Sequence, residues 1–397
     1  MRKSTFYRTA IGALAIAASF TLAACGGGLA GPATTPDAGG ASPTAGGTFK
    51  LGLLAPFSGD YNMYGNYMLF GAQAAAADIN AAGGVLGNQV EIVKGDDQCD
   101  ATQAANAANK LVSDGIVASV GGYCSGATLP TIPIFTGANI PMLISVANSD
   151  SLVEKANPNV FLIDGTGTQQ ATVAFKYVQK MGYQNLFVID DKSDYSANLG
   201  KVFAKLAGDA GLKVASDSLT AGEAEFSAQV NKLISSGADF FYFTGYAPEA
   251  GQLIKQAVDA GYEGAILLGD GAVDKKVSEI AGQSITEDRV KATFAKTPDM
   301  LDDGGVFEAK YKQFSGGEAP GPFSIHSYDT VMLWATAAAE AGSTDMTKVS
   351  DVLRGISYEG LTGPIKFTEN GSREGSGGFV IVKVGPEGLF IFDVAVD

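Results

Sequence analysis

The stretch that decides the fold runs from Leu186 to Ser216 and reads LFVIDDKSDYSANLGKVFAKLAGDAGLKVAS. Its first four residues form an apolar run that predicts a strand, and residues 198–210 predict a helix. A glycine-containing turn then leads into a second strand over residues 212–216. A strand, a connecting helix and another strand in so few residues predict two parallel strands of one sheet with the helix on its face.

The same alternation extends to both sides of this stretch. It forms two runs, over residues 48–163 and 164–290, which predict an α/β protein with two lobes, each built on a doubly wound parallel sheet. The segment 127–136 is read as a helix although it contains two prolines. Expected strands cover 49–54, 90–93, 116–120, 140–144, 240–243 and 265–268, and expected helices cover 64–80, 101–112, 225–235 and 248–260.

The residues after 290 change character, with three expected helices followed by three expected strands. The helices are placed on the first lobe and the last strands return toward the hinge. The expected lobes are therefore 48–163 plus 293–375 and 164–292 plus 376–397. The late helices are expected at 306–314, 328–341 and 348–353, and the strands at 365–367, 379–384 and 389–394.

The beginning of the chain has the pattern of a secretory signal. Three basic residues (Arg2, Lys3 and Arg8) precede an uncharged apolar run over residues 9–22, which is short for a membrane span. We therefore expect residues 1–24 to be a signal peptide.

The end of that segment, Leu22-Ala23-Ala24-Cys25, resembles the lipobox of bacterial lipoproteins. The resemblance implies cleavage before Cys25 and a lipid on its sulfur; the alternative is a plain signal peptide with an incidental cysteine. Residues 25–47, rich in Gly, Ala, Pro and Thr, are expected to be a flexible linker behind this anchor. The protein is then expected in the periplasm or on the outer face of the cell membrane, attached by its lipid.

Charge and cysteine content narrow the function classes. The chain has a formal net charge of −15 and no cluster of Lys and Arg, which argues against a nucleic-acid partner. Besides Cys25 it has Cys99 and Cys124, and an even pair in an oxidising compartment suggests a disulfide. Two free thiols remain the alternative.

Polar residues that follow the expected strands mark the candidate binding site, because ligands bind beyond the carboxyl ends of parallel strands. Hydroxyls, tyrosines and a few carboxylates occur there, a set that suits a zwitterion. A carboxylate fits the turn of residues 121–126, with Ser125, at the start of the helix expected there. An ammonium fits Asp270. Ser125 as a simple helix cap and Asp270 as a solvated turn residue remain open alternatives.

At these residues the chain resembles the branched-chain amino-acid (Leu/Ile/Val) binding proteins of bacterial ABC importers. The resemblance implies a type I periplasmic-binding fold of two Rossmann-like lobes joined by three crossings, a Cys99–Cys124 disulfide and a membrane permease as partner. It rests on Asp96-Asp97-Gln98-Cys99-Asp100, the segment 108–115, Cys124-Ser125, Thr220-Ala221-Gly222-Glu223, Phe226-Ser227 and the segment 245–252.

The same resemblance implies how a ligand's head group is bound. Ser125 and Ser149 bind its carboxylate through hydroxyl and backbone N–H groups. The Ala147 carbonyl receives its ammonium, with Ser149 helping. Asp270 is the counter-charge from the second lobe.

Three tyrosines, Tyr64, Tyr195 and Tyr246, are implied to line the side-chain pocket or to complete the carboxylate contacts. The chain departs from the family at Asp270, where the best-known members have glutamate, and at Tyr64, where tryptophan is frequent. Tyr123 is bulkier than the usual leucine. These departures concern the ligand's side chain rather than its head group.

The expected function is therefore that of a solute-binding lipoprotein that closes two lobes around an aliphatic or small neutral amino acid. The alternative ligands are urea, short amides or another small organic acid; a sensor lobe and an α/β enzyme are further rivals. We expect no enzyme, because a catalytic set would have to use the single histidine, His326, which is read as packing or surface. No metal site and no cofactor are expected.

Overall fold

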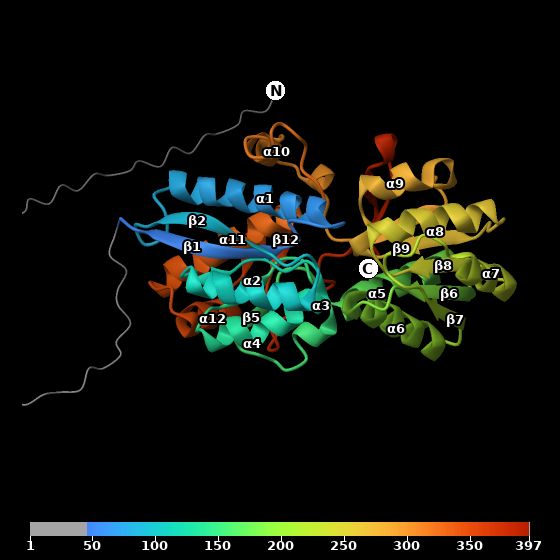
Figure 1. Cartoon of the computed structure of the whole chain (residues 1–397), viewed down its shortest axis with the longest axis horizontal. Helices are drawn as coiled ribbons and strands as arrows, with labels where there is room; N and C mark the ends of the chain where they lie inside the picture. Colours follow the sequence, from blue (N-terminus) through green and yellow to red (C-terminus); the bar gives the residue numbers. More distant parts are fainter. Residues whose placement is uncertain (1–45, 397) are drawn as a thin grey trace, which may run out of the picture. The chain divides into compact units, whose positions relative to one another are not determined.

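The computed structural model describes residues 46–396 (Figure 1). The signal peptide expected over 1–24, Cys25 and most of the linker lie outside the described residues. Within the described part no helix is long and apolar enough to cross a membrane.

The first sheet has five strands in the order β2-β1-β3-β4-β5, and all of its neighbours pair in parallel. β1 lies inside the sheet, and its residues Leu51, Leu53 and Leu54 are at most 1% exposed, as expected for a strand covered on both faces. The strands are β1 (Thr48–Ala55), β2 (Gln89–Asp96), β3 (Ala118–Ser119), β4 (Met142–Ile144) and β5 (Val160–Leu162).

Helices from both ends of the chain accompany this sheet. α11, late in the sequence, packs against α1, close to the start. Figure 1 shows α11 and α12, in orange-red, next to the blue and cyan elements of the first sheet. The helices are α1 (Asn62–Ala81), α2 (Ala101–Ser113), α3 (Ser125–Thr128), α4 (Ile132–Gly137), α10 (Val306–Tyr311), α11 (Ser324–Ala341) and α12 (Met346–Gly355).

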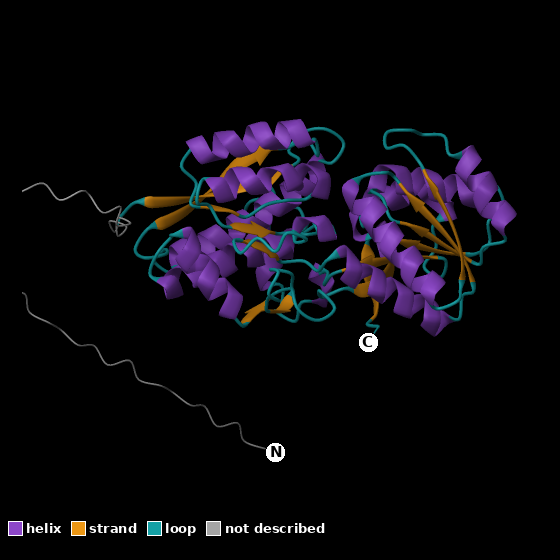
Figure 2. Ribbon diagram, turned by 90° about the horizontal axis from the view of Figure 1, so that it is seen from below, coloured by secondary structure: helices purple, strands orange, loops and turns teal. Residues whose placement is uncertain are grey.

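The second sheet has seven strands in the order β14-β13-β10-β9-β8-β6-β7. Figure 2 shows the strands of the protein in orange with helices, in purple, packed beside them. Five strands of this sheet pair in parallel, whereas β13 and β14 form an antiparallel edge. Its strands are β6 (Asn185–Asp190), β7 (Lys213–Ser218), β8 (Phe240–Phe243), β9 (Ala265–Leu268), β10 (Val290–Phe294), β13 (Val380–Val384) and β14 (Phe390–Val394). Its helices are α5 (Gly167–Met181), α6 (Asp194–Asp209), α7 (Ser227–Ser236), α8 (Ala247–Asp259) and α9 (Lys275–Ala281).

Short elements complete the described chain. β11 (Tyr358–Gly360) and β12 (Gly363–Ile365) form a small antiparallel hairpin. Single turns of 3-10 helix are η1 (Leu129–Thr131), η2 (Asp150–Leu152), η3 (Asp270–Ala272), η4 (Gly282–Ser284), η5 (Pro298–Met300) and η6 (Pro386–Gly388).

The mixed α/β architecture with parallel sheets was predicted, but several elements differ. The helix expected over 127–136 is broken into α3, η1 and α4, because Pro130 and Pro133 lack the N–H groups that a continuous helix requires. The antiparallel edge of the second sheet was not foreseen. α5, α9, β5 and β10 were not predicted, and β10 continues two residues past 292, where the second lobe was expected to end.

Two segments that connect the sheets lie against each other. A Cβ atom on Gly377 would lie 2.4 Å from the Gly165 Cα, so the close approach requires glycine. Arg373, 2% exposed, fixes the same region by donating to the carbonyl oxygens of Ile163 (3.1 Å), Thr362 (3.0 Å) and Pro364 (2.9 Å). The segments between the two sheets are therefore held by the close approach of these two glycines and by hydrogen bonds from the Arg373 side chain to backbone carbonyls.

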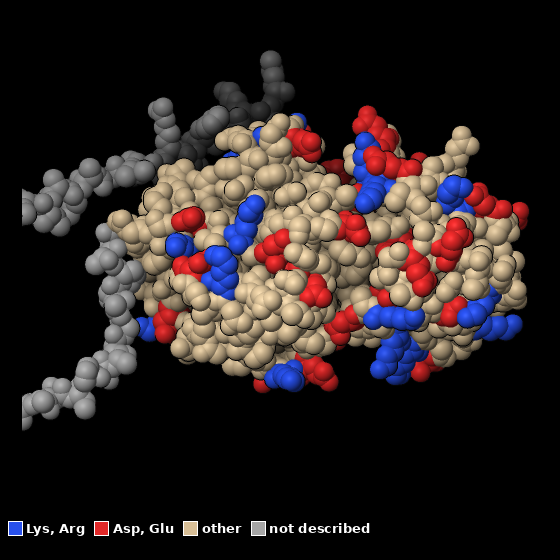
Figure 3. All heavy atoms as spheres, viewed as in Figure 1, with Lys and Arg blue, Asp and Glu red and all other residues tan. Residues whose placement is uncertain are grey.

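Acidic and basic side chains are interspersed on the face drawn in Figure 3. Several pairs are four residues apart on one helix, such as Lys110 with Asp114 and Lys312 with Glu308. Exposed pairs of this kind stabilise a helix only slightly.

Candidate functional site

A small pocket lies where loops from the carboxyl ends of strands in both sheets meet. Tyr123 and Ala147 follow β3 and β4 of the first sheet, and Asp270 follows β9 of the second. The pocket has a volume of about 10 Å³, at the lower limit of what one water molecule needs. Its lining residues are Tyr123, Val146, Ala147, Asn148, Tyr195, Tyr246, Asp270, Gly271 and Phe323.

Asp270 is the charged group of this pocket, and four hydrogen bonds hold it. Its Oδ1 accepts from the Tyr195 hydroxyl at 2.6 Å, the Gln170 Nε2 at 3.1 Å and the Gly271 N–H at 2.9 Å. Among the residues that the structure describes, its Oδ2 accepts only from the Asn148 Nδ2, at 3.0 Å. Because a carboxylate oxygen accepts more than one bond, Oδ2 retains capacity for a further donor.

Burial raises the pKa of Asp270 to about 6, and the hydrogen bonds from Tyr195, Gln170 and Gly271 oppose that rise. Asp270 is 3% exposed. With a pKa of about 6, its carboxyl group is largely ionised at neutral pH but readily protonated below pH 6. Asp164 lies near Asp270 at the end of β5, and burial together with the Asp270 charge raises its pKa well above the ordinary value. Of these two carboxylates, Asp270 lines the small pocket and Asp164 does not.

Asn148 and Gln170 connect the two sides of the pocket to Asp270. The Asn148 Nδ2 donates both to Asp270 and to the Gln170 Oε1, at 3.1 Å. Gln170 in turn donates to Asp270 and to the Thr293 hydroxyl, at 2.9 Å. Because the Asn148 Nδ2 donates to two acceptors, the orientation of its amide is fixed, and its Oδ1 is not bonded to Asp270 or Gln170.

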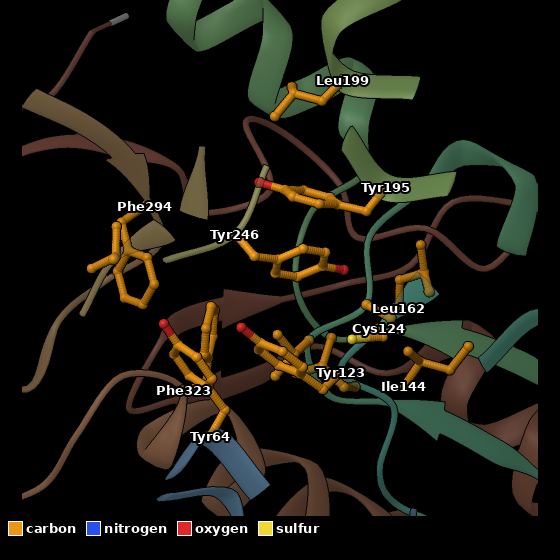
Figure 4. Close-up of a cluster of buried hydrophobic side chains, with 14 of the residues drawn as sticks. Tyr64, Tyr123, Cys124, Ile144, Leu162, Tyr195, Leu199, Tyr246, Phe294 and Phe323 are labelled. Carbon is orange, nitrogen blue, oxygen red and sulfur yellow. The ribbon is translucent and has the colours of Figure 1, made fainter. Parts of the chain in front are cut away.

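Aromatic rings form the rest of the wall. Figure 4 shows Tyr195, Tyr246 and Tyr123 following one another toward α1. The centroids of Tyr195 and Tyr246 are 5.2 Å apart and those of Tyr123 and Tyr246 5.9 Å. Tyr64 stacks on the other side of Tyr123 at 4.7 Å with an interplanar angle of 17°, behind the pocket wall. Phe323 contacts Tyr123 edge-on.

Glycines beside Asp270 let two of these rings approach the backbone. A Cβ on Gly269 would lie 2.3 Å from the Tyr195 hydroxyl, and one on Gly271 would lie 2.9 Å from the Tyr246 ring. Glycine at position 269 therefore permits the contact between Tyr195 and Asp270, and glycine at position 271 leaves room for the Tyr246 ring.

Ser125 and Ser149 bond to each other beside the pocket rather than line it. The Ser149 N–H donates to the Ser125 Oγ at 3.2 Å, and Ser125 is fully buried. α3, which begins at Ser125, has only four residues, so the long helix expected behind this turn is not there to contribute its dipole. The available donors here are hydroxyl and loop N–H groups.

A second, wider cavity of about 1020 Å³ is lined by Ser149, Asp150 and Ser151 together with residues from the start of α6. Two hydrogen bonds beside this cavity join the loop after β4 to α6. The Ser151 hydroxyl donates to Asp194 at 2.8 Å, and the Asp150 N–H donates to the Asn198 Oδ1 at 3.3 Å. The loop after β4 is therefore bonded to the second sheet's helix α6 as well as to Asp270.

Of the seven ligand-binding residues expected from sequence, the structure brings four into the small pocket: Ala147, Tyr195, Tyr246 and Asp270. Ser125 and Ser149 adjoin the pocket through the loop after β4, and Tyr64 lies behind Tyr123.

Other lining or supporting residues were not selected from the sequence. Asn148 sits between two expected residues, so its loop position was available as a signal. Phe323 and Gln170 had no such signal, because Phe323 precedes α11 and Gln170 lies on the unpredicted α5.

His326 is fully buried in α11, and both of its ring nitrogens lack hydrogen-bond partners among the described residues. It lies between the rings of Phe294 and Phe323. Burial lowers its pKa to about 3, so it is neutral. Within residues 46–396 no group of three or more His, Cys, Asp or Glu side chains is placed to hold a metal ion.

The sequence profile described as periplasmic binding protein matches residues 48–388. The chain belongs to the periplasmic binding protein family. Its members are solute-binding proteins and not enzymes, and the family implies a place outside the cytoplasm. The observed fold, with a pocket between the strand ends of two sheets, agrees with this family.

Individual relatives support the same assignment. A leucine-, isoleucine-, valine-, threonine- and alanine-binding protein of Pseudomonas aeruginosa is 33% identical, over 82% of this chain and 87% of its own length. The crystal structure of a leucine-binding protein, LivK, from Thermotoga maritima has a TM-score of 0.80 at 26% identity and covers 88% of this chain and 99% of its own. LivJ of Streptococcus pneumoniae, in complex with isoleucine, has a TM-score of 0.74 at 26% identity and covers 87% of this chain and 100% of its own.

Proposed function

We propose that this chain binds an aliphatic or small neutral amino acid between its two lobes and presents it to a membrane ABC permease. The observation that carries the proposal is the buried Asp270 carboxylate, which accepts a hydrogen bond from Asn148 and lines one small pocket together with Asn148 and Ala147. A negative group on one side and backbone and hydroxyl groups on the other suit a charge-separated ligand. The relatives named for amino acids add to this support.

The ligand ammonium is assigned to the Asp270 Oδ2, which has one donor within the described part of the chain, and to the Ala147 carbonyl. The carboxylate is assigned to the Ser125 hydroxyl and to the Ser149 N–H, which in this structure donates to the Ser125 Oγ at 3.2 Å and would exchange that acceptor for the ligand. Tyr195 and Tyr246 are assigned to the ligand's side chain, and Tyr64 supports them through Tyr123.

A hinge motion is proposed to admit the ligand, because the pocket of about 10 Å³ is too small to receive an amino acid as it stands. The lobes assigned to the motion are 48–163 plus 293–375 and 164–292 plus 376–397. A ligand bound to one lobe gains Asp270 and Tyr246 from the other on closure. That differential affinity shifts the population to the closed form.

Attachment to the membrane is also a proposal. Residues 1–24 would be removed, Cys25 would carry a lipid, and residues 26–47 would tether the domain. Replacement of Cys25 by Ser is expected to move the protein from the membrane fraction to the soluble fraction. Retention of this variant in the membrane fraction would contradict the anchor.

We further propose a disulfide between Cys99 and Cys124. Their Cα atoms are 5.3 Å apart, within the range of bonded pairs. Asp97, whose Oδ1 accepts from the Cys99 N–H at 2.9 Å, holds this turn.

The decisive experiment is a thermal-shift and calorimetric screen of the purified protein against the amino acids, urea, acetamide and small carboxylates. Binding of neutral amino acids is expected, with Asp270→Ala abolishing it. Binding of urea, an amide or a simple carboxylate instead, or unchanged amino-acid affinity in Asp270→Ala, would reject the proposal.

A further inference from the structure

Three residues beside the pocket form a chain of hydrogen bonds that joins the loop after β4 to α6. The Ser149 and Ser151 hydroxyl oxygens are 3.0 Å apart, and the Ser151 hydroxyl donates to the Asp194 Oδ2 at 2.8 Å. Asp194 is the first residue of α6, a helix of the second sheet. The chain therefore leads from Ser149, whose N–H is assigned to the ligand's carboxylate, to the second sheet's side of the site.

The direction of each bond in this chain follows from the number of protons. A serine hydroxyl donates one proton, whereas a carboxylate oxygen accepts. Because Ser151 gives its proton to Asp194, it can only accept from the Ser149 hydroxyl, and Ser149 is the donor in that bond. The same Ser149 oxygen accepts from the Ser151 N–H at 3.4 Å. While the chain is intact, the Ser149 hydroxyl therefore has no proton to offer to a ligand carboxylate.

We propose that Ser151 and Asp194 are positioning residues for the ligand's carboxylate, and that Ser149 binds the ligand through its N–H while its hydroxyl connects the loop to α6. This inference rests on the proposed function and concerns one end of its ligand. The family resemblance implied that the Ser149 hydroxyl binds the ligand, so these hydrogen bonds give it a different role in this chain. The bonds can form only when α6 lies against the loop, which couples the position of Ser149 to closure.

Local capping does not account for the whole chain of bonds. Ser149 precedes η2, and its oxygen caps that turn by accepting from the Ser151 N–H. A cap uses a lone pair of the oxygen and makes no use of the hydroxyl proton or of Asp194. Ser149 is 1% exposed, so water competes little for that proton. The bond between the two hydroxyls is thus additional to the cap and serves the contact with α6.

Asp194 also lies close to the other residue assigned to the carboxylate. A Cβ atom on Gly126, the residue after Ser125, would lie 3.7 Å from the Asp194 Cβ, which is ordinary van der Waals contact. The neighbouring Asn148 makes the corresponding link at the ammonium end, through its bond to Asp270 at 3.0 Å. Each end of the proposed ligand site is thus joined to the second sheet by a residue of the same loop.

A double-mutant cycle tests the role of the Ser149 hydroxyl. Calorimetry with alanine and leucine is carried out on the purified protein, freed of bound ligand. Ser149→Ala and Ser151→Ala should each weaken binding about fivefold, and the double variant should also weaken it about fivefold, because all three break the same chain of bonds. A Ser149 hydroxyl that bound the ligand directly would instead give a loss in Ser149→Ala and no loss in Ser151→Ala.

Asp194 provides a second test, by conservative replacement. Asp194→Asn keeps an oxygen that accepts from Ser151 and should bind within about twofold of the unaltered protein, whereas Asp194→Ala should match Ser151→Ala. In small-angle scattering without ligand, Ser151→Ala and Asp194→Ala should show a larger radius of gyration, because fewer bonds hold the closed form. The matched control is Ser113→Ala, which removes a hydroxyl that donates to the Asn109 carbonyl at 3.0 Å on α2 and should change neither measurement. Circular dichroism and melting curves establish that the variants are folded.

The outcomes separate this inference from the function on which it rests. If amino acids bind and folded Ser151→Ala keeps the affinity of the unaltered protein, the inference is overturned and the proposed function stands. A double variant whose loss is the product of the single losses, about 25-fold, overturns it equally. If no amino acid binds the unaltered protein, the proposed function falls and this inference falls with it.

Discussion

Lowering the pH from 7.5 to 5.0 should weaken amino-acid binding about tenfold, because it protonates the carboxylate that we propose receives the ligand's ammonium. Burial raises the pKa of Asp270 to about 6. The group is then about 97% ionised at pH 7.5 and about 10% ionised at pH 5.0, whereas the ligand's own charges do not change over this range. The loss corresponds to about 1.4 kcal/mol of binding free energy.

Isothermal titration at half-unit pH steps measures this effect, and Asp270→Asn identifies its source. The variant retains a side chain of the same shape without a titrating charge, so its affinity should be weak and independent of pH. The matched control is Asp274→Asn, at a buried carboxylate that caps α9 and does not line the small pocket. An affinity that stays flat in the unaltered protein, or a pH dependence that survives in Asp270→Asn, would refute the reasoning.

The same titration should act on folding stability in the opposite direction when no ligand is present. The pKa of Asp270 is about 6 in the folded protein, above its ordinary value of 3.8. The folded state therefore holds a proton that the unfolded state releases, and this stabilising contribution is complete below about pH 4 and lost as the pH rises through about 6. The contribution is about 3 kcal/mol. Denaturant titrations at several pH values, compared with Asp270→Asn, isolate it.

Two further predictions concern the backbone around the site. Gly269→Ala should weaken amino-acid binding at least about tenfold in calorimetry, because its Cβ would lie 2.3 Å from the Tyr195 hydroxyl and displace it from Asp270; unchanged affinity would mean that this contact is dispensable. Arg373→Met should lower the free energy of unfolding by about 3 kcal/mol in denaturant titrations, because it leaves the buried carbonyls of Ile163, Thr362 and Pro364 without their donors. A loss no larger than that of an exposed control, Lys110→Met, would contradict this role.

The fold was largely predictable because strand and helix periods are local. The quoted stretch gave β6, α6 and β7 close to their observed bounds, since each has its apolar pattern within a few residues. α5 was missed although Thr166 and Gln169 form a capping box at its start, a local signal that could have found it. Prolines inside 127–136 were the competing signal that broke the expected helix there. The direction of the final strands was not predictable, because it depends on contacts with β10.

The candidate site was predictable only where a residue follows a strand. Asp270, Tyr195 and Tyr246 were selected because they stand after β9, β6 and β8. Position after a strand does not say which groups bond to one another. The bond between Asn148 and Asp270 joins residues 122 apart in sequence. Gln170 lies on α5, which was overlooked in the sequence, so its contact with Asp270 became visible only from the structure.

Asp270, the proposed partner of the ligand's ammonium, accepts hydrogen bonds from both lobes. Tyr195 and Gly271 come from the same sheet as Asp270, whereas Asn148 comes from the loop after β4 of the first sheet. A ligand ammonium at the free position of Oδ2 would therefore join a carboxylate that is already bonded across the cleft. Ser151 and Asp194 add another such bond at its edge. Because these bonds also favour contact between the lobes, the ligand does not have to supply the whole free energy of closure. The charge of the ligand then adds to an equilibrium between open and closed forms that these hydrogen bonds already shift toward the closed form.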